Sequence, residues 1–149
     1  PIPSPAMRGS EGGRELLQAH IRTVMNAQII TVGPDTPMLD GAREIAAHGI
    51  GAVPVVDMHQ RLLGLVSTSD VVALLQESES LESKSASDAM SPEPPAIDEF
   101  ATAEEAIDVL RNALIRHLPV TREGRLVGLV TASDLIRHLL QYYPAPEVA

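Results

Sequence analysis

The chain has 149 residues, of which 44% are apolar, so it is the size of one domain and can bury a substantial core. Its formal net charge of −9 argues against a nucleic-acid partner, because neutralising phosphates requires clustered lysine and arginine. The chain has no cysteine, which excludes disulfide bonds and fits a reducing compartment, and no apolar run approaches the ~20 residues of a membrane helix. We therefore expect a cytoplasmic protein, or the cytoplasmic part of a longer one, without membrane contact by this segment.

The first predicted elements are a linker, a helix and a strand. Residues 1–13 are rich in proline, glycine and serine and begin with Pro1, so we expect a disordered linker or the remnant of a longer polypeptide. A helix is predicted over residues 14–24, where apolar residues recur on one face. A short strand near residues 29–32 follows it.

A helix, a hairpin and a further helix come next. Apolar residues at helical spacing predict a helix over residues 37–48. Two short runs rich in β-branched residues, 53–56 and 62–66, flank a turn at residues 57–60 and predict a hairpin. Residues 71–75 form a helical run that closes this part of the chain.

The same kinds of element return after a polar linker. Residues 77–87 contain five serines and three glutamates and are typical of a connection between modules. A short strand at 95–97 precedes a helix over 102–115, which begins with the Thr-x-x-Glu pattern of a capping box. A second hairpin follows, with a tight loop at 122–124 whose glycine permits a positive φ. The last helix, over 135–140, ends before prolines that cannot continue it.

The order of elements repeats because the sequence itself is duplicated. Three landmarks of the first half return in the second with a one-residue difference in loop length. They are Thr23-Val24-Met25 and Asp88-Ala89-Met90, Val53-Pro54-Val55 and Leu118-Pro119-Val120, and the heptapeptides that run from Gly64 to Asp70 and from Gly128 to Asp134. We therefore divide the chain into a first module with its N-terminal helix (14–76), a linker (77–87), a second module (88–143) and a tail (144–149).

One module alone is too small to bury the apolar face of its sheet well. We expect an α/β (α+β) fold in which two βαββα modules pack sheet to sheet about a pseudo-twofold axis. The clefts where the modules meet are then the natural ligand sites.

The duplicated residues resemble a known family. Met25 with the stretches 48–57 and 64–70, and their counterparts at 89–92, 115–120 and 128–134, are similar to CBS (cystathionine β-synthase) motifs. The resemblance covers about residues 21–141 and implies a tandem pair, or Bateman module. Such pairs bind AMP, ADP, ATP or S-adenosylmethionine, control an attached or separate effector, and often associate as a disc-like homodimer.

Two hydroxyl-x-x-Asp motifs stand at strand-to-helix junctions, one from Ser67 to Asp70 and one from Thr131 to Asp134. One interpretation is a capping box, with the hydroxyl at the N-cap and the acid near the third helical position. The resemblance favours another, in which the carboxylate accepts the ribose hydroxyls while Ser or Thr binds ribose or phosphate near a helix N-terminus. The two roles are compatible. The residues alone do not assign either carboxylate to a particular cleft.

The resemblance also implies a slot for adenine, which must be aliphatic because the chain has only one Phe and two Tyr. Ordinary core packing is the alternative role for the same residues. The slot residues are Met25, Ile30, Gly51, Ala52 and Pro54 from the first module, and Met90, Pro95, Arg116, His117 and Pro119 from the second.

The two modules differ just before the hairpin proline, where Gly51-Ala52 corresponds to Arg116-His117. Arginine offers a forked, permanently charged donor for phosphate, and the corresponding residues of AMP-binding family members are sometimes His and Arg. A solvated basic pair on an acidic protein is the alternative. We predict that the cleft containing Arg116 and His117 binds nucleotide more tightly than the other.

We expect a regulatory, energy-sensing module rather than an enzyme, with no catalytic cofactor. The histidines lack the paired spacing of a metal site, and no glycine-rich phosphate loop or nucleophile motif appears. The alternative is a structural dimerisation module whose clefts are empty. The two intact hydroxyl-x-x-Asp motifs favour ligand binding over that alternative.

Overall fold

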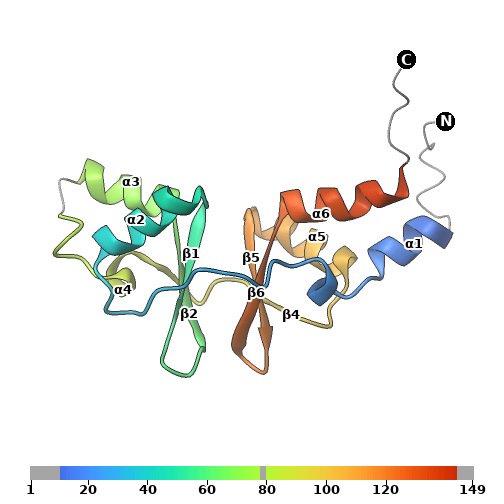
Figure 1. Cartoon of the computed structure of the whole chain (residues 1–149), viewed down its shortest axis with the longest axis horizontal. Coiled ribbons are helices and arrows are strands. Elements are labelled where there is room, and N and C mark those ends of the chain that lie inside the picture. The colour runs from blue at the N-terminus through green and yellow to red at the C-terminus, as the bar shows by residue number, and fades with distance from the viewer. Residues whose placement is uncertain (1–10, 78–79, 144–149) are drawn as a thin grey trace, which may run out of the picture.

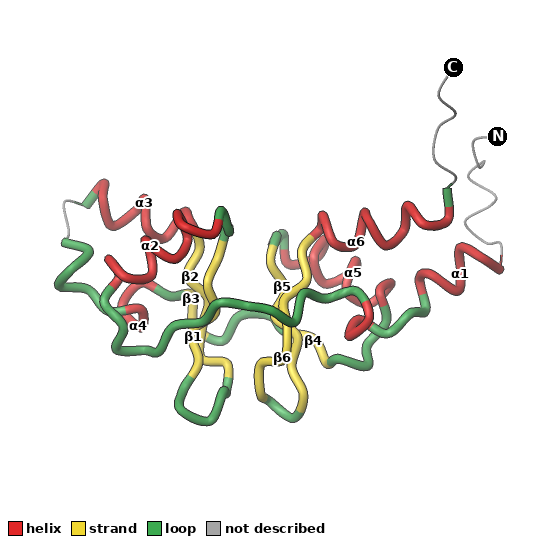
Figure 2. Tube along the Cα trace, in the orientation of Figure 1, coloured by secondary structure: helices red, strands yellow, loops and turns green. Residues whose placement is uncertain are grey.

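The computed structural model describes residues 11–77 and 80–143, which form two halves side by side (Figure 1). Within these residues the strands form two three-stranded sheets, of order β1-β2-β3 and β4-β5-β6. The sheets stand in the middle of the molecule and the helices lie on its outer flanks (Figure 2). The predicted α/β fold of two modules packed sheet to sheet is confirmed.

The first module consists of α2 (Met38–His48), β1 (Ala52–Val56), β2 (Leu62–Ser67) and α3 (Thr68–Gln76). Helix α2 ends at Gly49, whose φ of 61° is a left-handed conformation that glycine adopts without strain. The hairpin turn between β1 and β2 is held by Asp57, whose carboxylate accepts hydrogen bonds from the backbone N–H groups of His59 and Arg61.

The second module repeats this order with β4 (Ile97–Asp98), α5 (Ala103–Ala113), β5 (His117–Arg122), β6 (Arg125–Thr131), α6 (Ala132–Leu139) and the 3₁₀ turn η3 (Leu140–Tyr142). The predicted capping box is confirmed, because the Glu105 N–H donates to the Thr102 hydroxyl at 3.1 Å and the Thr102 N–H donates to the Glu105 carboxylate at 3.2 Å. Gly124 has the predicted positive φ, at 81°.

The segment that leads into each module crosses to the sheet of the other module. Strand β3 (Ser91–Pro92), which leads into the second module, pairs antiparallel with Gly64 and Leu65 of β2. Asn26, which leads into the first module, forms the equivalent bridge with Leu129 of β6. Each sheet therefore contains backbone from both halves of the sequence.

Glycine allows this crossing at two equivalent positions. A Cβ placed on Gly64 would lie 2.7 Å from Cγ of Met90, and one placed on Gly128 would lie 2.9 Å from Cγ of Met25. Both separations are shorter than van der Waals contact, so the two methionines pack directly on glycine backbone. Met90 on Gly64 and Met25 on Gly128 are thus equivalent contacts between a lead segment and the sheet of the other module.

The hydrophobic core consists of one cluster in each half. The first cluster includes Val53, Val55 and Val66 of the β1-β2 hairpin. The second includes Leu118 of β5 and, from the distant N-terminal part of the chain, the fully buried Ile21. The segment before α2, which the sequence assigned to the first module, therefore completes the core of the second.

Three elements differ from the sequence predictions. The helix predicted over 14–24 is divided into α1 (Glu11–Leu17), which begins inside the expected linker, and the 3₁₀ turn η2 (Ile21–Thr23), because His20 is extended where Ile21 enters the second core. The strand predicted over 29–32 is reduced to one parallel bridge between Val32 and Val55. The linker predicted over 77–87 contains the start of α4 (Ala86–Ala89), which a capping box at Ser85 initiates. The predicted tail, residues 144–149, lies outside the described residues.

Candidate functional site

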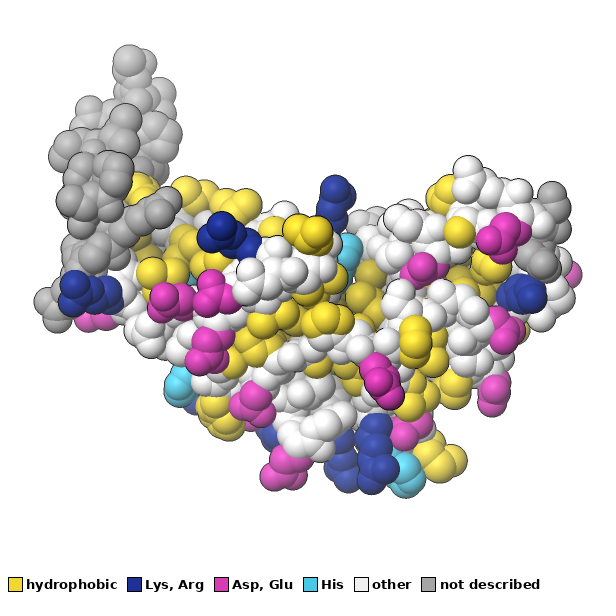
Figure 3. All heavy atoms as spheres, turned by 180° about the vertical axis from the view of Figure 1, so that it is seen from behind, with side chains coloured by type: hydrophobic (Ala, Val, Ile, Leu, Met, Phe, Trp, Pro, Cys, Tyr) yellow, Lys and Arg dark blue, Asp and Glu magenta, His cyan; other side chains and the backbone are white. Residues whose placement is uncertain are grey.

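A cleft of about 620 Å³, here called the first cleft, is lined by both modules. On the face shown in Figure 3, hydrophobic side chains line the hollow where the two halves meet. The first cleft brings Asp70 of the first module together with Arg116 and His117 of the second. Its further lining residues come from the β2-α3 junction (Ser67, Thr68, Ser69), from β3 and the chain after it (91–95), and from Gly51, Leu65, Leu114 and Ile115.

The carboxylate of Asp70 is oriented by the start of α3. The Ser67 N–H and hydroxyl donate to its Oδ2 at 2.7 and 3.0 Å, and the Asp70 N–H donates back to the Ser67 hydroxyl at 3.4 Å. Among the described residues, no hydrogen bond reaches the other carboxylate oxygen, Oδ1. The predicted capping box at Ser67 is therefore confirmed, and it leaves one carboxylate oxygen of Asp70 without a hydrogen bond from the described residues. The ligand-binding role of Asp70 is compatible with this geometry and stays a prediction.

The imidazole of His117 reaches across to the first module and packs on Gly51. A Cβ placed on Gly51 would lie 2.7 Å from Nε2 of His117, which explains why this position has no side chain. Burial, and secondarily the charge of Arg116, lowers the pKa of His117, so the ring is neutral at pH 7. Arg116 is exposed and carries the positive charge of this wall. Thr68 also lines the cleft, and its hydroxyl donates to the Gly51 carbonyl at 3.0 Å.

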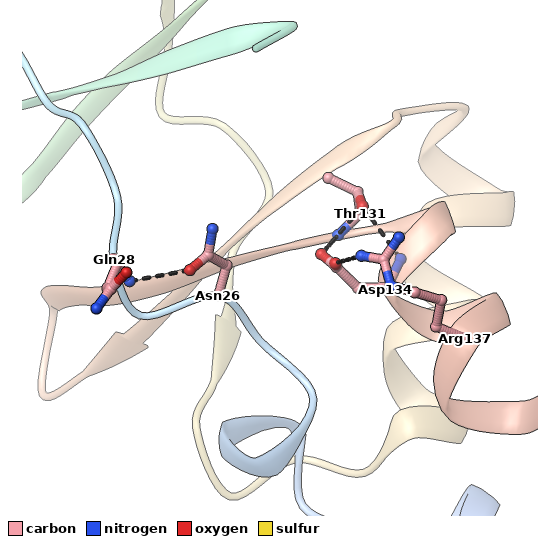
Figure 4. Close-up of polar contacts among 5 residues, drawn as sticks. All are labelled: Asn26, Gln28, Thr131, Asp134 and Arg137. Atoms are coloured by element: carbon pink, nitrogen blue, oxygen red, sulfur yellow. Dashed lines mark hydrogen bonds and ion pairs between the residues drawn. The ribbon is translucent and has the colours of Figure 1, made fainter. Parts of the chain in front are cut away.

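A smaller cleft of about 330 Å³, here called the second cleft, contains Asp134. Thr131 and Asp134 repeat the capping box, with the Thr131 N–H and hydroxyl donating to Oδ2 at 2.9 and 3.0 Å. Here the guanidinium of Arg137 also donates to Oδ1, so both carboxylate oxygens have partners (Figure 4). Asn26 lies on the facing segment, where its side-chain oxygen accepts from the Gln28 N–H at 3.0 Å.

The adenine-slot residues predicted from the first module do not gather in one cleft. Gly51 lines the first cleft, whereas Met25 lines the second. Ala52 and Pro54 are buried within β1. Ile30 is half-buried in the lead segment, which crosses to the other sheet.

The residues predicted from the second module are more concentrated. Pro95, Arg116 and His117 all line the first cleft. Pro119 is buried within β5, and Met90 packs against the first module's sheet. The first cleft therefore combines an aspartate from one module with the cationic wall of the other.

Several lining residues were missed from the sequence, and two cases show why. Residues 91–94 carry no hydrophobic period, and their pairing with β2 has no local signal in the sequence. Arg137 was detectable, because comparing the two modules places it opposite Ala73, three residues after the aspartate of each motif.

The described residues contain no group of three or more His, Asp or Glu side chains placed to hold a metal ion. None of the helices in this part of the chain has the length and hydrophobicity required to cross a bilayer.

Comparison with family models matches the CBS domain at residues 21–77 and again at 86–141. The chain is 31% identical over 126 residues to hypoxic response protein 1 of Mycobacterium tuberculosis, covering 81% of this chain and 85% of that protein. Its structure is similar to a crystal structure of hypoxic response protein I with two coordinated zinc ions (TM-score 0.75, 30% identity, 80% of this chain and 98% of that one). It is also similar to CBSX2 in complex with AMP (TM-score 0.74, 29% identity, 82% of this chain and 96% of that one). The chain therefore belongs to the CBS domain family and carries two CBS domains in tandem.

Proposed function

We propose that this CBS pair is a cytoplasmic regulatory module that binds an adenine nucleotide in the first cleft and controls an attached or separate effector. The observation that carries the proposal is the meeting of Asp70 with Pro95, Arg116 and His117 in one cleft between the modules. CBS pairs are typically regulatory rather than catalytic, and the related CBSX2 structure contains AMP, which supports the proposal.

In the proposed complex, each side chain has a role that its chemistry suits. Asp70 accepts the ribose hydroxyls with the oxygen that its capping box leaves available. Arg116 binds the phosphate with its planar fork, and the neutral His117 adds a hydrogen bond. Pro95 and Ile115 provide apolar surface for the adenine. A ligand that contacts both modules favours one relative orientation of them, which the effector then recognises.

The charges of the cleft favour a ligand with few negative charges. Among the described residues that line it, Arg116 is the one permanently cationic side chain, while Asp70 and Glu93 both contribute carboxylates. Each further phosphate adds negative charge near these acids without a further cation to balance it. We therefore rank AMP above ADP and ATP as the ligand, with S-adenosylmethionine as the candidate that lacks phosphate.

Thermal unfolding with AMP, ADP, ATP and S-adenosylmethionine at millimolar concentration tests the proposal. A ligand at a hundred times its Kd should add about 2.7 kcal/mol to the free energy of unfolding. Arg116→Ala should weaken AMP binding by roughly 10- to 100-fold, the loss expected for a hydrogen-bonded charge pair. Arg43→Ala is the matched control, because Arg43 is exposed on α2 and does not line the cleft. Unchanged AMP affinity in Arg116→Ala would contradict this binding mode, and no stabilisation by any ligand would favour a structural dimerisation module.

We also propose that two chains associate through α3 and α6, which both run along the upper side of the molecule in Figure 1. Val72 and Leu75 on α3, Ile136 on α6 and the adjoining Leu140 are each about half exposed. Clusters of exposed apolar side chains on surface helices are typical of an interface between proteins. Sedimentation of Ile136→Glu should give a monomer, whereas Met58→Glu, at the exposed hairpin tip, should leave a dimer unchanged. A monomeric unmodified chain would contradict this proposal.

A further inference from the structure

The two clefts differ at the position three residues after the aspartate of each motif. This residue is Ala73 in the first module and Arg137 in the second. Capping boxes bind Oδ2 of both aspartates, so Oδ1 is the oxygen that remains for a ligand. Arg137 donates a hydrogen bond to Oδ1 of Asp134 (Figure 4). No hydrogen bond within the described residues reaches Oδ1 of Asp70.

We propose that Arg137 occupies the second cleft as an internal competitor for ligand, and that the residue at this position determines which cleft accepts nucleotide. This inference rests on the proposed function, because it takes the aspartate as the group that binds the ribose hydroxyls. The duplicated motif thus produces one open site and one site that the chain itself occupies.

The burial of the ion pair supports a measurable effect. The Asp134 side chain is 15% exposed, so its carboxylate is shielded from water more than in an ordinary surface pair, although Arg137 is 70% exposed. A ribose must replace this charge-assisted hydrogen bond before it can bind. The expected penalty is on the order of tenfold in affinity, at the lower end for bonds to charged groups because the guanidinium remains solvated.

Helix α6 limits how the second cleft can open. His138 follows Arg137 on α6, and its Nε2 lies 2.7 Å from the Leu16 carbonyl oxygen. This hydrogen bond holds α6 against α1. Asp134 is released most directly by rotation of the Arg137 side chain alone. The second cleft has about 330 Å³ with Arg137 in place, against about 620 Å³ for the first.

A reciprocal exchange tests the inference with AMP as the probe. Arg137→Ala gives the second module the residue of the first, and Ala73→Arg does the reverse. Both positions are exposed on helices, so both variants should fold. The imidazole NMR signals of His117 and His138 report the first and second clefts separately, because each ring lines only one of them.

We expect the AMP midpoint of the His138 signal to fall about tenfold in Arg137→Ala, and the midpoint of the His117 signal to rise about tenfold in Ala73→Arg. Ala73→Met, which adds bulk without a charge or a hydrogen-bond donor, should leave the His117 midpoint within about twofold of the unmodified chain, since surface changes of this kind are usually small.

The outcomes separate this inference from the proposed function. If AMP does not move the His117 signal of the unmodified chain, the proposed function itself fails. If His117 responds normally but Arg137→Ala does not lower the His138 midpoint, the competitor role of Arg137 is wrong. A weaker second site in Arg137→Ala, or an unchanged or tighter first site in Ala73→Arg, would show that the arginine does not compete with AMP, and would also overturn the inference.

Discussion

The contact between Gly64 and Met90 makes a prediction about how the two modules are joined. In Gly64→Ala, the new Cβ would lie 2.7 Å from Cγ of Met90 and 2.9 Å from the backbone oxygen of Ser91. The first contact can be relieved by a rotation of the methionine, but the second requires β3 to move. Overpacking of this kind typically costs about 1–3 kcal/mol, and we expect the upper half of that range because backbone is involved.

The equivalent substitution in the other module provides an internal comparison. In Gly128→Ala, the Cβ would lie 2.9 Å from Cγ of Met25 and 3.1 Å from the backbone oxygen of Asn26. The backbone contact is looser here by 0.2 Å, the difference between 3.1 and 2.9 Å. Truncating or rotating the methionine should therefore relieve a larger share of the overpacking in Gly128→Ala than in Gly64→Ala.

Urea unfolding of two double-mutant cycles measures this difference. Gly64→Ala is combined with Met90→Ala, and Gly128→Ala with Met25→Ala. We expect both double mutants to be more stable than the sum of the single effects by about 0.5–3 kcal/mol, with the larger rescue in the Gly128 cycle. Additive effects in both cycles, or a larger rescue at Gly64, would refute the account of methionines packed on glycine backbone.

Three further predictions follow from single residues. Arg122 lowers the pKa of Glu99 by a side-chain hydrogen bond. The stabilisation by ionised Glu99 is therefore fully present above pH 4.5, the ordinary pKa of a glutamate, and is lost as the pH falls through the lowered pKa. The difference in unfolding free energy between the unmodified chain and Glu99→Gln should shrink in acid titrations. Burial lowers the pKa of His117, so stability should decline as the pH falls below 6.5, and His117→Gln should lack that part of the decline in urea titrations. Thr131→Ala removes an N-cap and should cost about 1 kcal/mol of unfolding free energy, whereas Thr131→Ser should cost little.

The duplicated architecture was predictable because its signals are local. The capping motifs, the hairpin turn at Asp57 and the positive φ of Gly124 each depend on a few neighbouring residues, and the structure contains all of them. The crossing of the lead segments was not predictable in the same way. The crossing consists of one two-residue pairing, between β2 and β3, and one single-residue bridge, between Asn26 and Leu129, and neither leaves a periodic pattern in the sequence.

That crossing decides how the candidate site is composed. Because β3 pairs with β2, the chain before Pro95 lies beside the aspartate of the first module rather than that of the second. Asp70 consequently faces Arg116 and His117, an assignment that spacing along the chain could not make. The helical break at His20 has the same origin, since the chain must straighten to deliver Ile21 to the core of the other half.

The hydroxyl-x-x-Asp motif caps a helix in both modules, so its presence alone does not identify a ligand site. Ser67 and Thr131 each begin a helix with the same reciprocal hydrogen bonds to aspartate, so selection for helix stability alone would maintain both motifs. The capping box uses one carboxylate oxygen, and among the described residues the hydrogen bonding of Asp70 and Asp134 differs at the other oxygen. In both modules of this CBS pair the hydroxyl-x-x-Asp motif therefore begins a helix. We expect it to form a ligand site only where the second oxygen remains available, as Oδ1 of Asp70 does within the part of the chain that the structure describes.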